Sequence, residues 1–304
     1  MSLRIYRHTV MATILYAVLI ILWGAFVRIS GSGDGCGKHW PLCQGVLLPQ
    51  GDVAYQLQTW IEFIHRAKSG LFGLLVFALW LVSYRLFPKG HLARKAAFAT
   101  LIFTVIEALL GALLVIKGYV DTDQSLGRVL SQGFHLANTL LLLGSLAALW
   151  AWSKYLRPRF DFSYKTLIIL GLCGFFLIGV SGSIASLSNT LFPSQSLTEA
   201  ISKDLAESSH IILRFRIFHP LMAVLFSSLL LYLIISLRNR SNQRPFLSMA
   251  LPWIIIGALG FGAATLLMLS PIWMKLTHLL IADVLWVGIV IFVCDSLTQE
   301  KTEG

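Results

Sequence analysis

Charged side chains are scarce in this chain: Asp, Glu, Lys and Arg make up 12% of its 304 residues, whereas hydrophobic residues make up 57%. This shortage excludes a soluble domain, and the mean hydropathy of +0.77 agrees. Apolar runs of about 20 residues are long enough to cross a hydrocarbon core roughly 30 Å thick. Eight such runs predict an all-α membrane protein with eight transmembrane helices, at residues 9–29, 63–86, 96–118, 128–152, 164–186, 212–236, 247–269 and 272–295.

The segments that connect these runs differ in their acidic residues, which are fewer in every second segment along the chain. With the N-terminus inside, the inner segments hold fourteen Lys and Arg against four Asp and Glu, whereas the outer segments hold ten against eight. Because basic residues gather on the cytoplasmic side of membrane proteins, both termini are predicted to be cytoplasmic. The formal net charge of +10 then reflects topology and excludes nucleic acid as a partner. The first run lacks a small-residue cleavage site, so we expect a retained helix.

Cysteine is also rare, with four residues in the chain. Cys36 and Cys43 share the glycine-rich outer segment GSGDGCGKHWPLCQG at 31–45, where oxidising conditions allow a disulfide to persist. Their spacing of seven residues also permits one. Three interpretations stay open: a redox-active thiol pair, a structural staple, and a metal site that includes His39. The corresponding outer segment of the second half, 187–210, has no cysteine.

The chain divides into two similar halves. The basic segment SKYLRPRFDFSYK at 153–165 separates a first half, 1–155, from a second half, 156–304. Each half has a long outer segment after its first helix, and the junctions WGAFVRISGSG at 23–33 and IGVSGSIASLS at 178–188 are similar. Four helices return a chain to the same side of the membrane, so the halves are predicted to be parallel repeats. We therefore expect two pseudo-symmetric four-helix bundles.

Four histidines lie near the outer ends of predicted spans, two in each half: His65, His135, His219 and His278. An imidazole inside hydrocarbon is costly and indicates a functional site. Within each half the two helices that carry these histidines run parallel, so their side chains can meet in the bundle interior. The simplest cofactor that takes two axial histidines from neighbouring helices is a heme. The sequence thus predicts two heme sites toward the outer face.

Heme propionates need cationic partners, and guanidinium groups match carboxylate geometry. Four arginines near the predicted outer surface are candidates for these contacts: Arg66, Arg128, Arg214 and Arg216.

A carboxylate lies one helical turn from one of the histidines. In the motif EFIHR, Glu62 and His65 share a helix face because they are three residues apart. Such an acid could accept a proton or stabilise cationic character during an oxidation, or it could simply end the helix at the water boundary. The second half has Arg216 three residues before His219 in place of the acid. We infer that the first half hosts the chemistry and the second a structural or electron-transfer heme.

Two more acids lie inside predicted spans. Glu107 is expected either to lie on a proton path or to pack, protonated, in the bundle interior. Asp283 follows His278 by about one and a half turns and is expected to hydrogen-bond a helix neighbour in support of that site.

The chain resembles the heme A synthase family. The resemblance rests on GAFVR followed by GSGDGCGKHWPLCQG, on EFIHR, on EALLGALLV and on FHLAN, and it is most specific at 24–66. The second half is similar more loosely, through SGSIASLSNTLFPSQSL and its two histidines. The resemblance implies an eight-helix enzyme of cytochrome oxidase biogenesis in the bacterial inner membrane. It oxidises the C8 methyl of heme O to a formyl group, which gives heme A.

The resemblance also implies roles for individual residues. It assigns His65 and His135 to the substrate heme, and His219 and His278 to a bound heme b. It places Glu62 on the critical acid of the family and the pair Cys36 and Cys43 on loop cysteines that form a disulfide.

The sequence departs from the family at two points. The family pattern GHR at the second-half histidine is FHP here, and the second-half cysteine pair of some members is absent. Implied partners are heme O synthase, cytochrome oxidase assembly factors and an unidentified electron donor, and a homo-oligomer is left open. The alternative is a diheme membrane cytochrome b that carries electrons between quinol and a partner. Such a carrier does not require the asymmetry between Glu62 and Arg216.

Overall fold

The computed structural model describes residues 1–49, 53–154, 159–160, 163–206, 210–238 and 245–299. These residues form ten α-helices and one antiparallel pair of two-residue strands. Eight helical segments of this described part are long and apolar enough to cross a membrane, which confirms the predicted spans. The predicted boundary at 155–156 lies outside the described residues.

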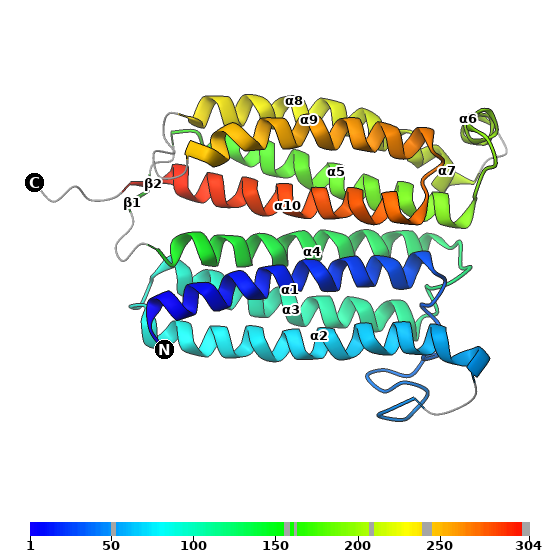
Figure 1. Ribbon diagram of the computed structural model, residues 1–304, viewed down its shortest axis with the longest axis horizontal. Helices are drawn as coiled ribbons and strands as arrows, with labels where there is room; N and C mark the ends of the chain where they lie inside the picture. The colour runs from blue at the N-terminus through cyan, green and yellow to red at the C-terminus, as the bar shows by residue number, and fades with distance from the viewer. Residues whose placement is uncertain (50–52, 155–158, 161–162, 207–209, 239–244, 300–304) are drawn as a thin grey trace, which may run out of the picture.

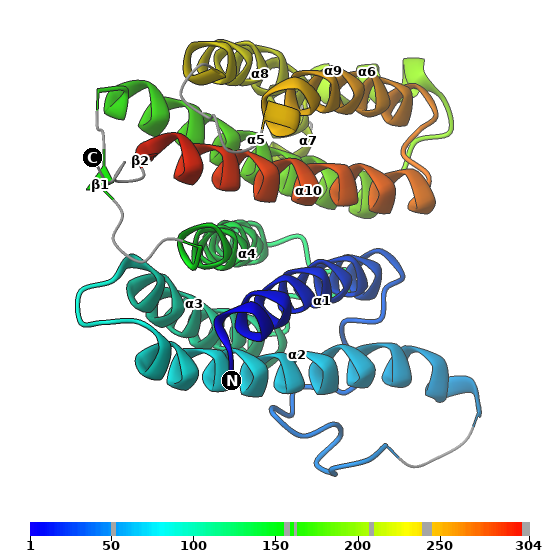
Figure 2. The same ribbon diagram turned by 60° about the vertical axis from the view of Figure 1, so that its left-hand side comes forward.

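Four long helices form the first half and lie side by side in both views (Figures 1 and 2). Their bounds are α1 Leu3–Ile29, α2 Val53–Leu86, α3 Leu92–Ile116 and α4 Leu126–Trp152. Side chains cap three of these helix starts: Ser2 accepts from the Ile5 N–H, His91 from the Ala93 N–H and Ser125 from the Arg128 N–H. Such caps satisfy donors that a helix leaves unpaired at its N-terminus.

The second half contains four long helices and two short ones. Their bounds are α5 Lys165–Leu191, α6 Leu197–Leu205, α7 Ile211–Arg216, α8 Phe218–Leu237, α9 Pro245–Leu267 and α10 Ile272–Leu297. The strands β1, Arg159–Phe160, and β2, Thr298–Gln299, pair near the end of α10.

The sixth predicted span is divided between α7 and α8. The division follows from Pro220 in the first turn of α8, because proline has no N–H to donate to the carbonyl of Arg216. The amphipathic helix α6, which hydropathy alone did not predict, lies before α7 at the same end of the molecule as residues 30–49 (Figure 1). We call this end the loop end. α1 begins and α10 ends at the opposite end.

The two halves pack against each other through α4, which contacts both α10 and α5, and through α1, which contacts α10; α4 and α10 lie next to each other in Figure 1. The indole Nε1 of Trp286 on α10 donates to the carbonyl of Leu140 on α4 at 2.8 Å. A Cβ at Gly144 would lie 3.2 Å from that nitrogen, so glycine allows the indole to approach. The ring of Phe175 on α5 stacks on the indole with centroids 4.9 Å apart. The seam between the halves is therefore well packed, and the histidines lie nearer the loop end.

Candidate functional site

The first pair of histidines comes from α2 and α4. His65 and His135 lie close enough for their charges to interact. The Nδ1 atoms of both rings are buried and make no hydrogen bond in the described part of the chain. Buried polar atoms normally have partners. Nδ1 of His135 lies 3.5 Å from a carboxylate oxygen of Glu107, whereas Nδ1 of His65 has no hydrogen-bond partner among the described residues.

The second pair comes from α8 and α10. The ring centroids of His219 and His278 lie 6.4 Å apart with the planes at 76°. His219 Nδ1 is 3.2 Å from the hydroxyl of Ser181. Phe261 lies almost parallel to the ring of His278, with centroids 6.3 Å apart. Helices α8 and α10 thus bring the imidazoles of His219 and His278 next to each other.

A glycine faces the first histidine of each pair. A Cβ at Gly24 on α1 would lie 2.8 Å from Cε1 of His65, and a Cβ at Gly182 on α5 would lie 2.9 Å from Cε1 of His219. Both distances are too short for any larger residue unless the imidazole moves. When the two similar junctions are aligned, Gly24 corresponds to Gly179. The glycine that lies against His219 is Gly182, three residues later in the chain.

The same relation recurs at the second histidine of each pair. A Cβ at Gly262 on α9 would lie 3.0 Å from Cε1 of His278, whereas one at Gly111 on α3 would lie 3.9 Å from Cε1 of His135. Each imidazole thus lies against a glycine of the span that precedes it in the chain. The sequence interpretation missed all four glycines, because a glycine in an apolar helix carries no sign of which helix it faces.

Paired imidazoles with glycines at their edges fit a flat macrocycle whose metal needs two axial ligands. A bare metal ion fits less well, because no group of three or more His, Cys, Asp or Glu side chains in the described residues could hold one. The donors present therefore fit heme.

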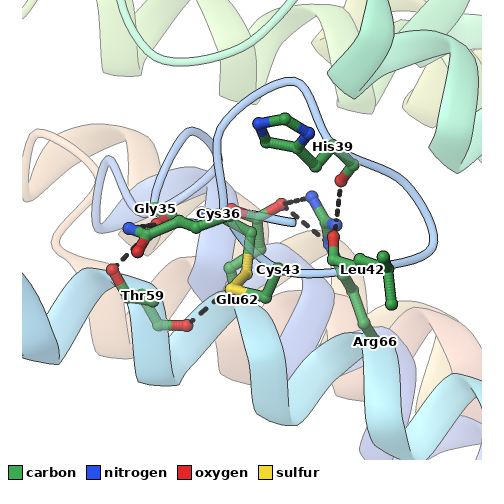
Figure 3. A network of polar contacts seen from close by, with 9 residues as sticks. Gly35, Cys36, His39, Leu42, Cys43, Thr59, Glu62 and Arg66 are labelled. Carbon is green, nitrogen blue, oxygen red and sulfur yellow. Dashed lines mark hydrogen bonds and ion pairs between the residues drawn. A yellow bond between two sulfur atoms is a disulfide. The ribbon is translucent and has the colours of Figure 1, made fainter. Parts of the chain in front are cut away.

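Glu62 on α2 is hydrogen-bonded to the loop that contains Cys36 and Cys43 (Figure 3). Its side chain is buried, with 3% exposed, and Oε2 accepts the backbone N–H of Cys36 at 2.8 Å. Arg66 donates to Oε1 from Nη2 at 2.5 Å and from Nε at 3.1 Å. Cys36 is joined to Cys43, which confirms the disulfide and rules out a metal site on these two sulfurs. Both oxygens of this carboxylate are thus held by the loop and its own helix.

Arg66 and Thr59 also bind this loop to α2. Arg66 Nη1 donates to the carbonyls of His39 at 2.5 Å and Leu42 at 2.7 Å, and the Thr59 hydroxyl donates to that of Gly35 at 2.8 Å (Figure 3). A Cβ at Gly35 would lie 2.6 Å from the Gln58 backbone, so only glycine fits there. All three guanidinium nitrogens of Arg66 donate to Glu62 or to this loop, whereas the sequence suggested a propionate contact.

Two more of the arginines suggested for propionates hold loops in the same way. Arg128 is 2% exposed and donates to the carbonyls of Asp121 at 2.5 Å and Asp123 at 2.7 Å. Arg216 binds the carboxylate of Asp204 through Nη2 at 2.5 Å and Nε at 3.1 Å, which fastens α6. Arg214 is exposed.

Positive charge without a carboxylate partner lies elsewhere, at the loop end of the seam between the halves. Arg28 on α1 donates to the Ser186 hydroxyl on α5 at 2.9 Å. With the side-chain amide of Gln132 on α4 turned so that its oxygen faces the guanidinium, that oxygen accepts from Arg28 Nη1 at 2.5 Å. Lys275 on α10 is near enough to interact with the charge of Arg28. No acid forms an ion pair with Arg28 or Lys275 within the described ranges, so the two cations are suited to an anionic ligand. Lys275 stands three residues before His278, a sequence signal that could have identified it.

The remaining acids differ in surroundings. Glu107 on α3 lies 3.5 Å from Nδ1 of His135. Asp283 is buried at 2% exposure, and its Oδ2 has no hydrogen-bond partner among the described residues, so the expected support for His278 is not seen at that atom.

The model of the COX15-CtaA family, described as cytochrome oxidase assembly protein, matches residues 7–290. The chain belongs to this family. The match confirms the resemblance to heme A synthases noted in the sequence.

Relatives of the family from three bacteria match the chain. Protoheme IX farnesyltransferase of Thermus thermophilus is 39% identical over 292 residues, which are 94% of this chain and 47% of that protein. Heme A synthase of Symbiobacterium thermophilum is 38% identical over 120 residues, 40% of this chain and 38% of the relative. Heme A synthase of Bacillus cereus is 29% identical over 178 residues, 59% of this chain and 53% of the relative. The chain spans about half the length of the curated relatives it matches, or less.

Proposed function

We propose that this member of the family is a heme A synthase, an oxidoreductase that converts the C8 methyl of heme O into the formyl of heme A. The observation that carries the proposal is the buried Glu62, held one helical turn from His65 by a disulfide-closed loop. The second half has matching histidines and glycines but presents Arg216 at that position. A protein that only binds two hemes does not need an acid in one half and an arginine in the other, whereas an enzyme that oxidises one of the two hemes does.

We assign the substrate to the first half, 1–155, with His65 and His135 as its axial ligands. His219 and His278 of the second half, 156–304, would hold a heme b, which supplies a one-electron carrier between the substrate site and an outside acceptor. With dioxygen as the terminal oxidant, one methyl group and one O₂ become one formyl group and one water, and four electrons leave the methyl carbon. The chain's task is to place that carbon and receive its protons.

Individual side chains account for that task. Glu62 is positioned to take up a proton released at the methyl edge, because its own hydrogen bonds keep the carboxylate fixed in a water-poor site. Arg28 and Lys275, instead of the four arginines suggested by sequence, would bind the propionates. The glycines beside the imidazoles leave the space that the rings occupy.

Location and partners follow from the same proposal. We place the protein in the bacterial inner membrane with both termini in the cytoplasm, so that the loop end and both hemes face outward. The name of the Thermus relative supports a partnership with a farnesyltransferase, the class of enzyme that must supply a farnesylated heme. Assembly factors of cytochrome oxidase would receive the product.

Extraction of the bound hemes tests the function. The chain is purified from cells that supply heme O, and its hemes are separated by chromatography. Heme A or a hydroxylated heme O supports the proposal. Heme b alone, with no conversion on turnover, favours the diheme electron carrier, for which the matched histidine and glycine pairs of the two halves would suffice.

A further inference from the structure

One acid approaches a proposed iron ligand. Glu107 Oε1 on α3 lies 3.5 Å from Nδ1 of His135 on α4. Two residues of the next turn of α4 hold this carboxylate: Asn138 Nδ2 donates to Oε2 at 2.6 Å, and the Thr139 hydroxyl is hydrogen-bonded to Oε1. Asn138 also donates to the carbonyl of Phe103 at 2.8 Å, which fixes the amide itself. The carboxylate therefore has a defined place beside the ring.

Among the described residues, none of the other three histidines forms an ion pair with a carboxylate. Nδ1 of His65 and Nδ1 of His278 are buried without a hydrogen-bond partner in the described part of the chain. Nδ1 of His219 faces the Ser181 hydroxyl at 3.2 Å, which is a neutral group. His135 is thus distinguished from the other three by a carboxylate.

We propose that Glu107 is a positioning residue that accepts the Nδ1–H of His135 and so makes this imidazole the most electron-donating of the four ligands. The inference rests on the proposed function, because it takes His135 as a ligand of iron. A carboxylate on the far nitrogen of a ligating histidine fixes the ring and raises its basicity. The separation of 3.5 Å is longer than a hydrogen bond. The side chains keep 29% and 23% exposure, so packing leaves the ring room to turn and close it.

The consequence is a direction for electron flow. A more basic ligand stabilises the ferric state and lowers the potential of the iron it binds. The first half then gives up an electron more readily than the second half, where a neutral hydroxyl and an unpartnered nitrogen face the ligands. The heme held by His65 and His135 would give up one electron and the heme held by His219 and His278 would take it up, while the Nδ1 proton stays between His135 and Glu107. Electrons from the substrate side thus run toward the second half.

Redox titration of the purified holoprotein, with both hemes followed by their absorption, tests this proposal. Glu107→Gln keeps the length of the side chain but removes the charge and replaces one acceptor oxygen by a donor nitrogen. We expect the midpoint potential of the first-half heme to rise by about 59 mV, which corresponds to a tenfold change in its ferric preference. The second-half heme, assigned by its loss in His278→Ala, should not move. Ser181→Ala is the matched control and should leave the first-half potential unchanged.

An unchanged first-half potential, or an equal rise at both hemes, would overturn the proposal. If Glu107→Gln does not fold, Thr139→Val retains the acid but removes one of its supports, and a smaller rise confined to the first half is expected. If the first-half potential depends on Glu107 but no heme A is formed, the proposed function is wrong and this inference holds. If heme A is formed but the potential does not shift in Glu107→Gln, the proposed function holds and this inference is wrong.

Discussion

Arg66 and Glu62 form an ion pair of 2.5 Å across one turn of α2, and each of them also holds the disulfide loop: Glu62 through the N–H of Cys36, Arg66 through two carbonyls. The acid proposed for the chemistry is therefore positioned by a covalently closed loop. In the second half, Arg216 stands three residues before its histidine and binds α6 instead. In both halves the residue three positions before the first histidine holds an outer segment, but it is an acid in the first half and an arginine in the second.

The disulfide should act as a structural staple for Glu62. Replacing Cys36 and Cys43 together by alanine opens a small covalently closed loop. This lowers the free energy of unfolding of the loop by about 2–3 kcal/mol. We expect faster proteolysis within residues 31–49 and a several-fold loss of heme A formation with hemes still bound. Cys173→Ala, at an exposed free cysteine, is the control. Complete loss of conversion with a protease-resistant loop would indicate instead that the sulfurs take part in the redox chemistry.

The glycines should control heme binding one half at a time. Gly24→Ala places a Cβ 2.8 Å from the His65 ring, and Gly182→Ala places one 2.9 Å from that of His219. Overpacking of this kind costs about 1–3 kcal/mol, so heme affinity should fall about tenfold or more in the altered half only. Gly257→Ala is the control, because nothing lies within 4 Å of its Cβ. Heme content of each half, measured by absorption spectra, gives the result; equal loss from both halves would contradict the account.

Arg28 should recognise the carboxylates of a heme. A charge-assisted hydrogen bond contributes about 1.5–3 kcal/mol, so Arg28→Gln should weaken binding of heme b about ten- to hundredfold. It should not weaken binding of the heme b dimethyl ester, which has no carboxylate. Ser186→Ala removes the hydrogen bond between the halves and retains the charge, and it serves as the control. If the ester and the free acid lose affinity equally in Arg28→Gln, the residue acts only through the packing of the seam.

Arg216 should hold α6 to the rest of the second half. Its guanidinium and the Asp204 carboxylate are 8% and 12% exposed, and breaking a buried pair by removing one partner costs about 3–5 kcal/mol. Arg216→Gln should therefore expose residues 192–206 to proteases. The exposed pair of Glu199 and Lys203 offers the control: the hydrogen bond from Lys203 lowers the pKa of Glu199, yet Glu199→Gln should leave proteolysis unchanged. Protection that survives in Arg216→Gln would show that α6 is held by its apolar contacts.

The spans and the four histidines could be predicted from sequence because both depend on local patterns. A run of apolar residues predicts a membrane helix wherever the chain goes next, and a histidine inside such a run is conspicuous. Contacts between helices are not encoded locally. Thus Arg28 and Gly182 carried no signal of their partners, and Arg66 and Arg128 were expected to bind propionates although loop carbonyls occupy them. The break before α8 was open to prediction, since Pro220 marks it in the sequence.

The chemical role of Glu62 is the central claim, and heme analysis of Glu62→Gln in cells that supply heme O tests it most directly. Glu199→Gln, which removes an exposed acid that also has a basic partner four residues later, is the control. The account predicts that Glu62→Gln retains its hemes, accumulates heme O and forms no heme A, whereas the control forms heme A normally. Heme A formed by Glu62→Gln at the rate of the unchanged chain would contradict the account.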